Sequence, residues 1–385
     1  MKQLLFLLGS VLLTGTAISV NAQVPADKAL NLAVKQYKQM MTQVPDTLMP
    51  RTTNNLTGQL ITSDTEWWTS GFYPGTLWYL YEYSKDQSIL KEARKRTNEV
   101  QKEQYNKTTH DLGFMMYCSY GNAYRLTKDP KDKQVLITSA RTLSTRFNPV
   151  VGCIKSWDHG KWKYPVIIDN MMNLELLTWA SKVTGDTSFA HIARTHANTT
   201  MQHHFRPDYS SYHVIGYDPA TGAVVAKNTA QGFADSSAWA RGQAWGLYGY
   251  TMMYRETKNA AYLEQAKKIA NYIIPHLPAD KVPYWDFDAP DIPHAKRDAS
   301  AGAVMAAALL ELSQYTKNQA YFQTAEQILQ TLCSDEYLAK EGTNNHFILK
   351  HSVGHLPANS EVDVPLTYAD YYFVEALLRY KKYSK

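Results

Sequence analysis

The chain has 385 residues, of which 44% are hydrophobic and 19% are charged, and it contains 16 prolines. This composition is typical of a folded globular protein and excludes a disordered or collagen-like chain. The formal net charge of +5 is spread without a long basic run, so binding to nucleic acid is not indicated. The 27 tyrosines and nine tryptophans exceed what a core needs, and such rings can also stack on sugars.

The first 22 residues have the pattern of a secretory signal peptide. Lys2 precedes an apolar run from Leu4 to Leu13, and small and polar residues follow as far as Ala22. The run is too short to span a bilayer. We therefore predict cleavage after Ala22, no membrane anchor, and export to the periplasm, with secretion to the medium as the alternative. The mature chain is residues 23–385, and its helical pattern predicts one domain.

Three cysteines, Cys118, Cys153 and Cys333, are widely separated along the chain. Their odd number and spacing indicate neither a disulfide framework nor a CxxC metal site. We expect buried free thiols, or at most one disulfide.

A short polar connector recurs between pairs of amphipathic segments. It reads Ser-Lys-Asp, Thr-Lys-Asp, Thr-Gly-Asp or Thr-Lys-Asn, and its last residue is placed to cap the next helix. These capping residues are Asp86, Asp129, Asp186, Asn259 and Asn318. Their spacing is too irregular for a short solenoid repeat. It indicates helical hairpins with long loops on one side only.

Helical periodicity predicts twelve helices, at 27–41, 69–84, 87–103, 112–127, 131–146, 169–184, 187–204, 235–257, 260–275, 298–316, 319–333 and 365–382. The second helix of each pair is the more apolar, as at 299–308, whereas the first carries a charged face, as at 91–96. The pattern predicts an all-α fold, an (α/α)6 barrel with six inner and six outer helices. We expect short strands in the loops at 206–234 and 281–297.

Each long loop leads into the start of an inner helix, so these helix starts share one face. Acidic, aromatic and arginine residues gather there, at 66–72, 110–114, 168–173, 235–245 and 296–300. The N-termini of the inner helices also direct partial positive charge toward this face. We therefore expect an active site there for an anionic ligand such as a carboxylated sugar.

The acidic residues of this face also have a simpler interpretation as helix N-caps, which applies to Asp111, Asp169, Asp235 and Asp298. Asp169 follows an apolar stretch that is expected to raise its pKa, as a general acid requires. A second carboxylate nearby, for which Asp111 is the candidate, would raise that pKa further.

The tryptophans have two interpretations as well. Some belong to the core, and others form a platform for sugar rings. The candidates are Trp68, Trp157, Trp162, Trp239 and Trp245.

These segments resemble the unsaturated glucuronyl hydrolases of glycoside hydrolase family 88. The resemblance runs through nearly the whole mature chain, at 68–72, 110–114, 169–173, 213–222 and 231–232, and is most specific in Trp-Ala-Arg-Gly-Gln-Ala-Trp at 239–245. The related unsaturated rhamnogalacturonyl hydrolases typically have Gly-Asn-Gly-Trp where this chain has Gly242-Gln243-Ala244-Trp245. The glucuronyl branch is therefore favoured, and the rhamnogalacturonyl branch is the alternative.

The resemblance implies a substrate made by a polysaccharide lyase, an oligosaccharide with a 4,5-unsaturated uronic acid at its non-reducing end. It implies that Asp169 protonates C4 of the double bond and activates the water that adds to C5. Asp111 would hold ring hydroxyls and tune Asp169. The uronic ring and its carboxylate would be bound by His213, Gln231 and Arg241, with Trp68, Trp239 and Trp245 as aromatic walls. The resemblance implies no cofactor and no metal.

Two other functions remain open from the residues alone. Asp111 and Asp169 could act as acid and base on a saturated glycoside, as in an inverting glycosidase. The protein could also bind acidic oligosaccharides without turnover. The loop at 351–360 is expected to border the leaving sugar, where Lys350, Ser352 and His355 either bind sulfate or are simply solvated.

Overall fold

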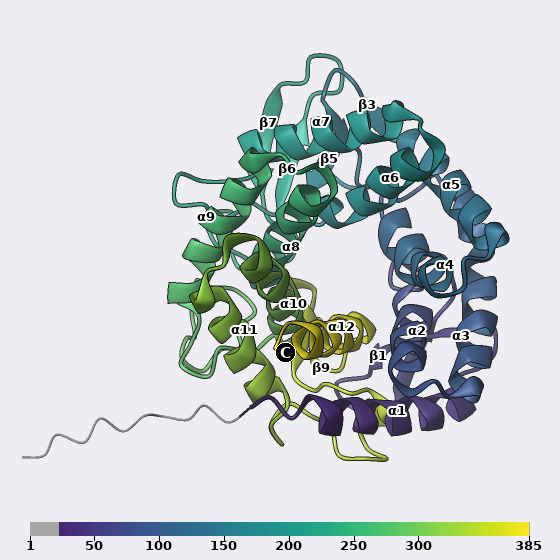
Figure 1. Cartoon of the computed structure of the whole chain (residues 1–385). Coiled ribbons are helices and arrows are strands. Elements are labelled where there is room, and N and C mark those ends of the chain that lie inside the picture. The colour runs from purple at the N-terminus through teal and green to yellow at the C-terminus, as the bar shows by residue number, and fades with distance from the viewer. Residues whose placement is uncertain (1–22, 385) are drawn as a thin grey trace, which may run out of the picture.

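The helices form two concentric rings in the computed structural model, which describes residues 23–384 (Figure 1). The predicted (α/α)6 barrel is confirmed. The inner ring consists of α2 (Phe72–Ser84), the π-helix η2 (Gly113–Gly121) continued by α4 (Asn122–Thr127), α6 (Asn170–Thr184), α8 (Ala240–Thr257), α10 (Ala299–Thr316) and α12 (Thr367–Tyr383). The outer ring consists of α1 (Ala26–Gln43), α3 (Gln87–Glu99), α5 (Pro130–Ser144), α7 (Thr187–His203), α9 (Ala260–His276) and α11 (Gln319–Leu332). Each inner helix contacts the next, and α12 contacts α2, which closes the ring.

The short connectors join each inner helix to the following outer helix by one repeated geometry. The residue after the inner helix has a left-handed backbone, with φ between 54° and 76° at Lys85, Lys128, Gly185, Lys258 and Lys317. Its N–H bonds to the carbonyl four residues earlier, which ends the helix. The predicted caps are confirmed, since Asp86, Asp129, Asp186, Asn259 and Asn318 each accept the N–H two residues ahead.

The long loops carry short antiparallel strands. These are β1 (Met49–Thr53), β2 (Leu60–Ser63), β3 (Phe147–Asn148), β4 (Cys153–Ile154), β5 (Tyr164–Ile167), β6 (Val214–Tyr217), β7 (Val224–Asn228), β8 (Ser352–His355) and β9 (Ser360–Val364). The only sheet of three strands in the described chain has the order β5-β6-β7. The loop at 206–234 contains strands as expected. The expectation was wrong at 281–297, which contains only isolated bridges.

Two inner helices begin differently from the prediction. The helix predicted at 235–257 begins at Ala240, because a side chain from another loop holds the preceding residues: Asp286 accepts hydrogen bonds from Ser237 Oγ and Phe233 N. The helix predicted at 112–127 begins as a π-helix at Gly113, which packs on the next inner helix. A Cβ on Gly113 would lie 2.3 Å from Asn173 Cα, so only glycine fits there.

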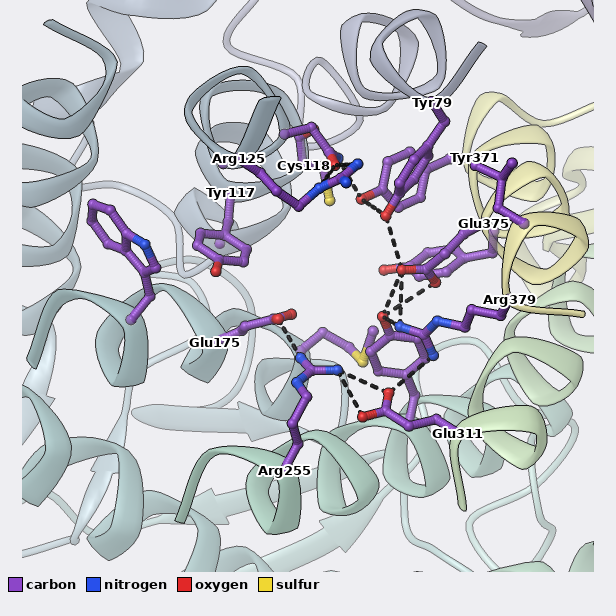
Figure 2. A pocket seen from close by; sticks show the side chains of 18 of the residues that line it. Tyr79, Tyr117, Cys118, Arg125, Glu175, Arg255, Glu311, Tyr371, Glu375 and Arg379 are labelled. Atoms are coloured by element: carbon purple, nitrogen blue, oxygen red, sulfur yellow. Dashed lines mark hydrogen bonds and ion pairs between the residues drawn. The ribbon is translucent and has the colours of Figure 1, made fainter. Parts of the chain in front are cut away.

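A cavity of about 620 Å³ occupies the barrel interior and reaches the C-terminal ends of α4 and α12 (Figure 2). An ion-pair network crosses it and joins four inner helices, through Glu175 of α6, Arg255 of α8, Glu311 of α10, and Glu375 and Arg379 of α12. None of the predicted site residues lines this cavity. The cavity nevertheless extends to Gly113, Phe114 and Met172, which belong to segments at the starts of the inner helices.

Some predictions concern the chain as a whole. All three cysteines are free, with Cys118 and Cys153 buried and Cys333 partly exposed. No helix within residues 23–384 is long and apolar enough to cross a membrane. The predicted signal peptide, residues 1–22, lies outside the described residues.

Candidate active site

The register of β5 and β6 brings Asp169 beside His213. Ile167 pairs with Val214 in the antiparallel ladder, and the next residue outward, Ile168, donates its N–H to the carbonyl of His213. Asp169 follows immediately, at the start of α6. As a result, His213 Nε2 lies 3.6 Å from Asp169 Oδ2.

Asp169 is a buried carboxyl group whose side chain caps no helix. Burial raises its pKa to about 7, the charge of Asp111 raises it as well, and the nearby Arg241 guanidinium opposes the shift. Asp169 Oδ2 has no hydrogen-bond partner within the described chain. The carboxyl group can therefore hold a proton near neutral pH and present it to a ligand.

His213 is held in one tautomer by its surroundings. Its Nδ1 accepts the N–H groups of Ala230 and Gln231, each at 3.1 Å, so the ring proton is on Nε2, the atom that faces Asp169. Burial and the charge of Arg241 keep the pKa of His213 well below its usual value. His213 is therefore a neutral N–H donor toward the site.

Asp111 lies at the start of η2 and is partly exposed. Its Oδ2 accepts a hydrogen bond from Thr109 Oγ1 at 2.7 Å, and its Oδ1 lies 3.3 Å from His110 Nε2. Burial lowers the pKa of His110, so this neighbour is also a neutral donor. Asp111 and Asp169 thus share one site in which only Asp169 is strongly buried.

Arg241 is buried, and its guanidinium is already used by the protein. Nη1 donates to Asp298 Oδ2 and to the carbonyl of Val353, while Nη2 donates to the carbonyl of Gly354 and to Gln231 Oε1. In this arrangement Arg241 anchors the hairpin of β8 and β9 and orients Gln231. It adds positive charge near Asp169, but its two terminal nitrogens already donate to protein acceptors and do not form a free bidentate site for a carboxylate ligand.

The predicted aromatic walls differ in how much surface they expose. Trp239 packs between the ring of His213, at 4.5 Å between centroids, and the guanidinium of Arg241, at 4.5 Å. Trp245 is 0% exposed, and its buried Nε1 is directed to Asp169, whose pKa it lowers. Trp68 is partly exposed and packs on Phe114. Of these three tryptophans, Trp68 is the one with an accessible ring.

Two further tryptophans lie at the edge of the site. Trp157 and Trp162 are both half-buried, with ring centroids 5.8 Å apart. Trp157 follows Ser156, whose carbonyl accepts the N–H of His110. Trp157 is therefore adjacent to the segment that carries Asp111.

The N-cap interpretation holds for one of the four aspartates. Asp298 caps α10 by accepting the N–H of Ser300, in addition to pairing with Arg241. Asp235 is not a cap, because its two oxygens bind Thr229 N and Asn228 Nδ2. The side chains of Asp111 and Asp169 cap no helix either.

Several residues that position the site were missed at the sequence level. Gln243 accepts the N–H of Ser211 and donates to the carbonyl of Tyr209, which fixes the loop before His213. Asn173 accepts the N–H of Phe114 and so links α6 to η2. The only available sequence signal was the presence of Gln243 and Asn173 in the segments already singled out.

The segment at 351–360 forms β8 and the turn of a hairpin, in which residues 357–359 are exposed. His355 Nε2 bonds to the carbonyl of Ala230, and Lys350 Nζ donates to the carbonyl of Asp335. Ser352 Oγ is buried without a hydrogen-bond partner in the described chain. Lys350 and His355 are thus engaged within the protein.

Comparison with known proteins shows a family and relatives that span most of the chain. Residues 33–385 match the model of Glycosyl Hydrolase Family 88. An unsaturated glucuronyl hydrolase of Formosa agariphila is 51% identical over 319 residues, which cover 81% of this chain and 79% of the relative. That of Bacillus sp. strain GL1 is 33% identical over 335 residues, covering 84% of this chain and 88% of the relative. A crystal structure of an unsaturated glucuronyl hydrolase specific for heparin has a TM-score of 0.91 and 53% identity, covering 93% of this chain and 97% of that chain.

The fold, the buried carboxyl group with its raised pKa and these relatives define the protein as a glycoside hydrolase. Within that class, the chain belongs to glycoside hydrolase family 88.

Proposed function

We propose that the protein is an unsaturated glucuronyl hydrolase that removes the 4,5-unsaturated uronic acid from the non-reducing end of lyase-generated oligosaccharides. The observation that carries this proposal is Asp169, whose pKa is raised to about 7 and whose unpaired Oδ2 faces the neutral Nε2–H of His213. Protonation of a carbon–carbon double bond needs an acid that keeps its proton at working pH.

The reaction follows from this acid. Protonated Asp169 donates its proton to C4 of the enol ether, and positive charge develops at C5. The resulting carboxylate takes a proton from the water that adds to C5, which restores the protonated acid. The hemiketal at C5 opens to a ketone and leaves a hemiacetal at C1, which collapses to an aldehyde and releases the remaining sugar. One water is consumed.

The other site residues bind and orient the substrate. His213 Nε2 and Trp245 Nε1 are buried donors without partners in the described chain, so a bound sugar can satisfy them. Arg241 attracts the uronate carboxylate through its charge while it keeps Gln231 and the 353–354 backbone in place. Asp111 accepts hydrogen bonds from ring hydroxyls and raises the pKa of Asp169.

We expect the substrate to derive from a glycosaminoglycan. The relative of 53% identity is described as specific for heparin, which makes a heparin-derived unsaturated disaccharide the first substrate to test. Chondroitin-derived disaccharides provide the comparison.

Loss of absorbance by the conjugated enol ether tests the activity directly. The purified protein is incubated with unsaturated disaccharides from heparin and from chondroitin, and with a saturated disaccharide as the control. Decay of the ultraviolet absorbance with release of the second sugar is expected for the unsaturated substrates only. Cleavage of the saturated disaccharide alone would instead identify an ordinary glycosidase, and binding without turnover would identify a capture protein. Turnover of unsaturated rhamnogalacturonan fragments alone would favour the rhamnogalacturonyl branch.

We also propose that the enzyme is exported to the periplasm. Lys2, the apolar run from Leu4 to Leu13 and the small residues before Gln23 support this. The expected result is a mature N-terminus at Gln23 in the periplasmic fraction. An intact Met1 in the cytoplasmic fraction would contradict the proposal.

A further inference from the structure

A groove of about 440 Å³ lies on the three-stranded sheet, outside the set of residues that perform the reaction. Lys161, Trp162 and Lys163 line one side of it. The other lining residues come from β6, β7 and the turn between them, namely Tyr217, Asp218, Val225, Ala226 and Asn228. The groove therefore offers one large aromatic ring between two cationic side chains.

Trp162 is fixed in place by packing and by a hydrogen bond. Its ring lies over Gly216, where a Cβ would be 3.0 Å from the indole Cδ1. Its Nε1 donates to Asn228 Oδ1 at 3.0 Å. Because the ring is half-buried and already ordered, stacking a sugar on it costs little conformational entropy.

The charges around the groove favour an anion. Lys161 and Lys163 are exposed, and Lys161 Nζ lies 4.9 Å from the centroid of the Trp162 ring. The one carboxylate in the lining, Asp218, is already bonded to the N–H groups of Ala220 and Thr221 in its own turn. Lys163 also acts on Asp218 through its charge. With two lysines and one carboxylate, the lining keeps a net positive charge that attracts a carboxylate or sulfate.

Two contacts link the residues of the groove to segments of the active site. Asn228, which holds Trp162, begins the segment whose residues Ala230 and Gln231 bind His213 Nδ1. On the other side, Trp162 contacts Trp157, which is adjacent to the segment of Asp111. These contacts give the direction, from Trp157 to Trp162, along which an oligosaccharide could extend from the site.

We propose that this groove binds anionic sugar residues beyond the one released, by stacking on Trp162 and by ion pairing with Lys161 and Lys163. The inference rests on the proposed function, because it places the non-reducing end of the oligosaccharide at Asp169. Glycosaminoglycan chains carry a carboxylate on every second sugar, so a tetrasaccharide presents a further anionic group that a disaccharide lacks. The enzyme then favours longer substrates through KM, not through kcat.

Steady-state kinetics with unsaturated heparin disaccharide and tetrasaccharide test this. The wild type is expected to show a lower KM for the tetrasaccharide. Replacing both lysines, Lys161→Gln with Lys163→Gln, is expected to raise the tetrasaccharide KM roughly 3- to 10-fold, as expected for two solvent-screened ion pairs, and to leave kcat and the disaccharide KM unchanged. The matched control, Lys131→Gln with Lys340→Gln, removes two exposed charges elsewhere and should change neither.

Trp162→Ala should also raise the tetrasaccharide KM. The melting temperature of this variant is measured as well, to detect any loss of packing over Gly216. Equal KM values for the two lengths in the wild type, or equal effects of the lysine variant on both, would overturn the proposal. If the wild type turns over neither substrate, the proposed function is wrong, and the groove is then tested by calorimetric binding alone. Weaker tetrasaccharide binding by the lysine variant than by the wild type, with disaccharide binding unchanged, supports the groove. Equal tetrasaccharide affinities of the two proteins overturn the proposal.

Discussion

His213 presents its Nε2 to Asp169 Oδ2 at 3.6 Å, with its Nδ1 already accepting two backbone N–H groups. The imidazole therefore faces the carboxyl group as a neutral donor and not as a cation. A charged imidazolium at this position would lower the pKa of Asp169 and weaken it as an acid. Because burial keeps the imidazole neutral, His213 does not lower the pKa of Asp169 as a cation would.

Replacing Asp169 by asparagine should abolish the proton transfer while preserving shape. We expect Asp169→Asn to fold normally and to lose at least ~10²-fold in kcat, as for removal of a general acid. The measurement is the rate of enol ether absorbance decay. Asp335→Asn, an exposed aspartate on the loop after α11, is the control and should retain full activity. Near-wild-type turnover of Asp169→Asn would remove Asp169 from its role.

The pH dependence of turnover should report the raised pKa of Asp169. The acid is active when protonated, so kcat/KM should be flat at low pH and fall as pH rises through about 7. Asp111 is one cause of the raised pKa, so Asp111→Asn should move this basic limb to lower pH. Profiles between about pH 5 and pH 9 would show the shift. If kcat/KM falls at the same pH in Asp111→Asn as in the wild type, the charge of Asp111 does not act on Asp169.

Arg241 acts largely through the residues it holds, so a lysine cannot replace it. Arg241→Lys is expected to raise KM and lower the melting temperature, because one ammonium cannot serve Asp298, Gln231 and two carbonyls together. Asp298→Asn removes the charged partner of Arg241 but leaves the guanidinium itself in place. This variant should also raise KM. Arg194→Lys on the exposed face of α7 should be neutral. An unchanged KM in Arg241→Lys would contradict this role.

Two glycines in inner helices make a matched pair for stability. A Cβ on Gly113 would lie 2.3 Å from Asn173 Cα, whereas one on Gly302 would find its nearest neighbour at 3.5 Å. Gly113→Ala should therefore lower the melting temperature strongly, since backbone must move. Gly302→Ala should gain roughly 0.5–1 kcal/mol of stability from the lower entropy of the unfolded chain. Thermal unfolding would distinguish them, and equal effects would refute the close packing at Gly113.

Stability should decrease as the pH rises from about 4 to about 7. Burial raises the pKa of Asp169, Glu175 and Asp370 to about 7. A raised carboxyl pKa means that the folded state holds protons more tightly than the unfolded state. The resulting stabilisation is complete below the unfolded pKa of about 4 and is lost as pH rises through about 7. Glu175→Gln, in the cavity of Figure 2, should reduce the change in melting temperature between about pH 5 and pH 7. An unaltered difference would contradict the assignment.

Much of the architecture could be predicted because it is encoded locally. The connector caps Asp86 to Asn318 act within two residues of their partners, and the apolar inner helices differ from the outer ones in composition alone. The site was also predictable in outline, because helix starts at one end of a barrel must converge. Asp169 and His213 then meet through one strand pair.

The remaining features depend on contacts distant in sequence. Arg241 is bonded to Val353 and Gly354, more than a hundred positions away, so its local motif could not show that its donors are occupied. Likewise, Asp286 lies on a separate loop and binds Ser237, so that α8 begins only at Ala240. The π-helical start of η2 depends on how closely Gly113 approaches Asn173 on the next helix.

The closed ring also constrains when folding can finish. The hydroxyl of Tyr37 in α1 donates to Asp370 of α12, 333 residues later. Helix α12 also packs against α2 and so joins the last inner helix to the first. Until the last helix has been synthesised, the aromatic face around Phe72 lacks its partners Tyr371 and Tyr372. In a nascent chain, or in one truncated before residue 367, the apolar faces of α2 and α10 that pack on α12 are therefore exposed. The barrel can close only after the final segment has left the ribosome.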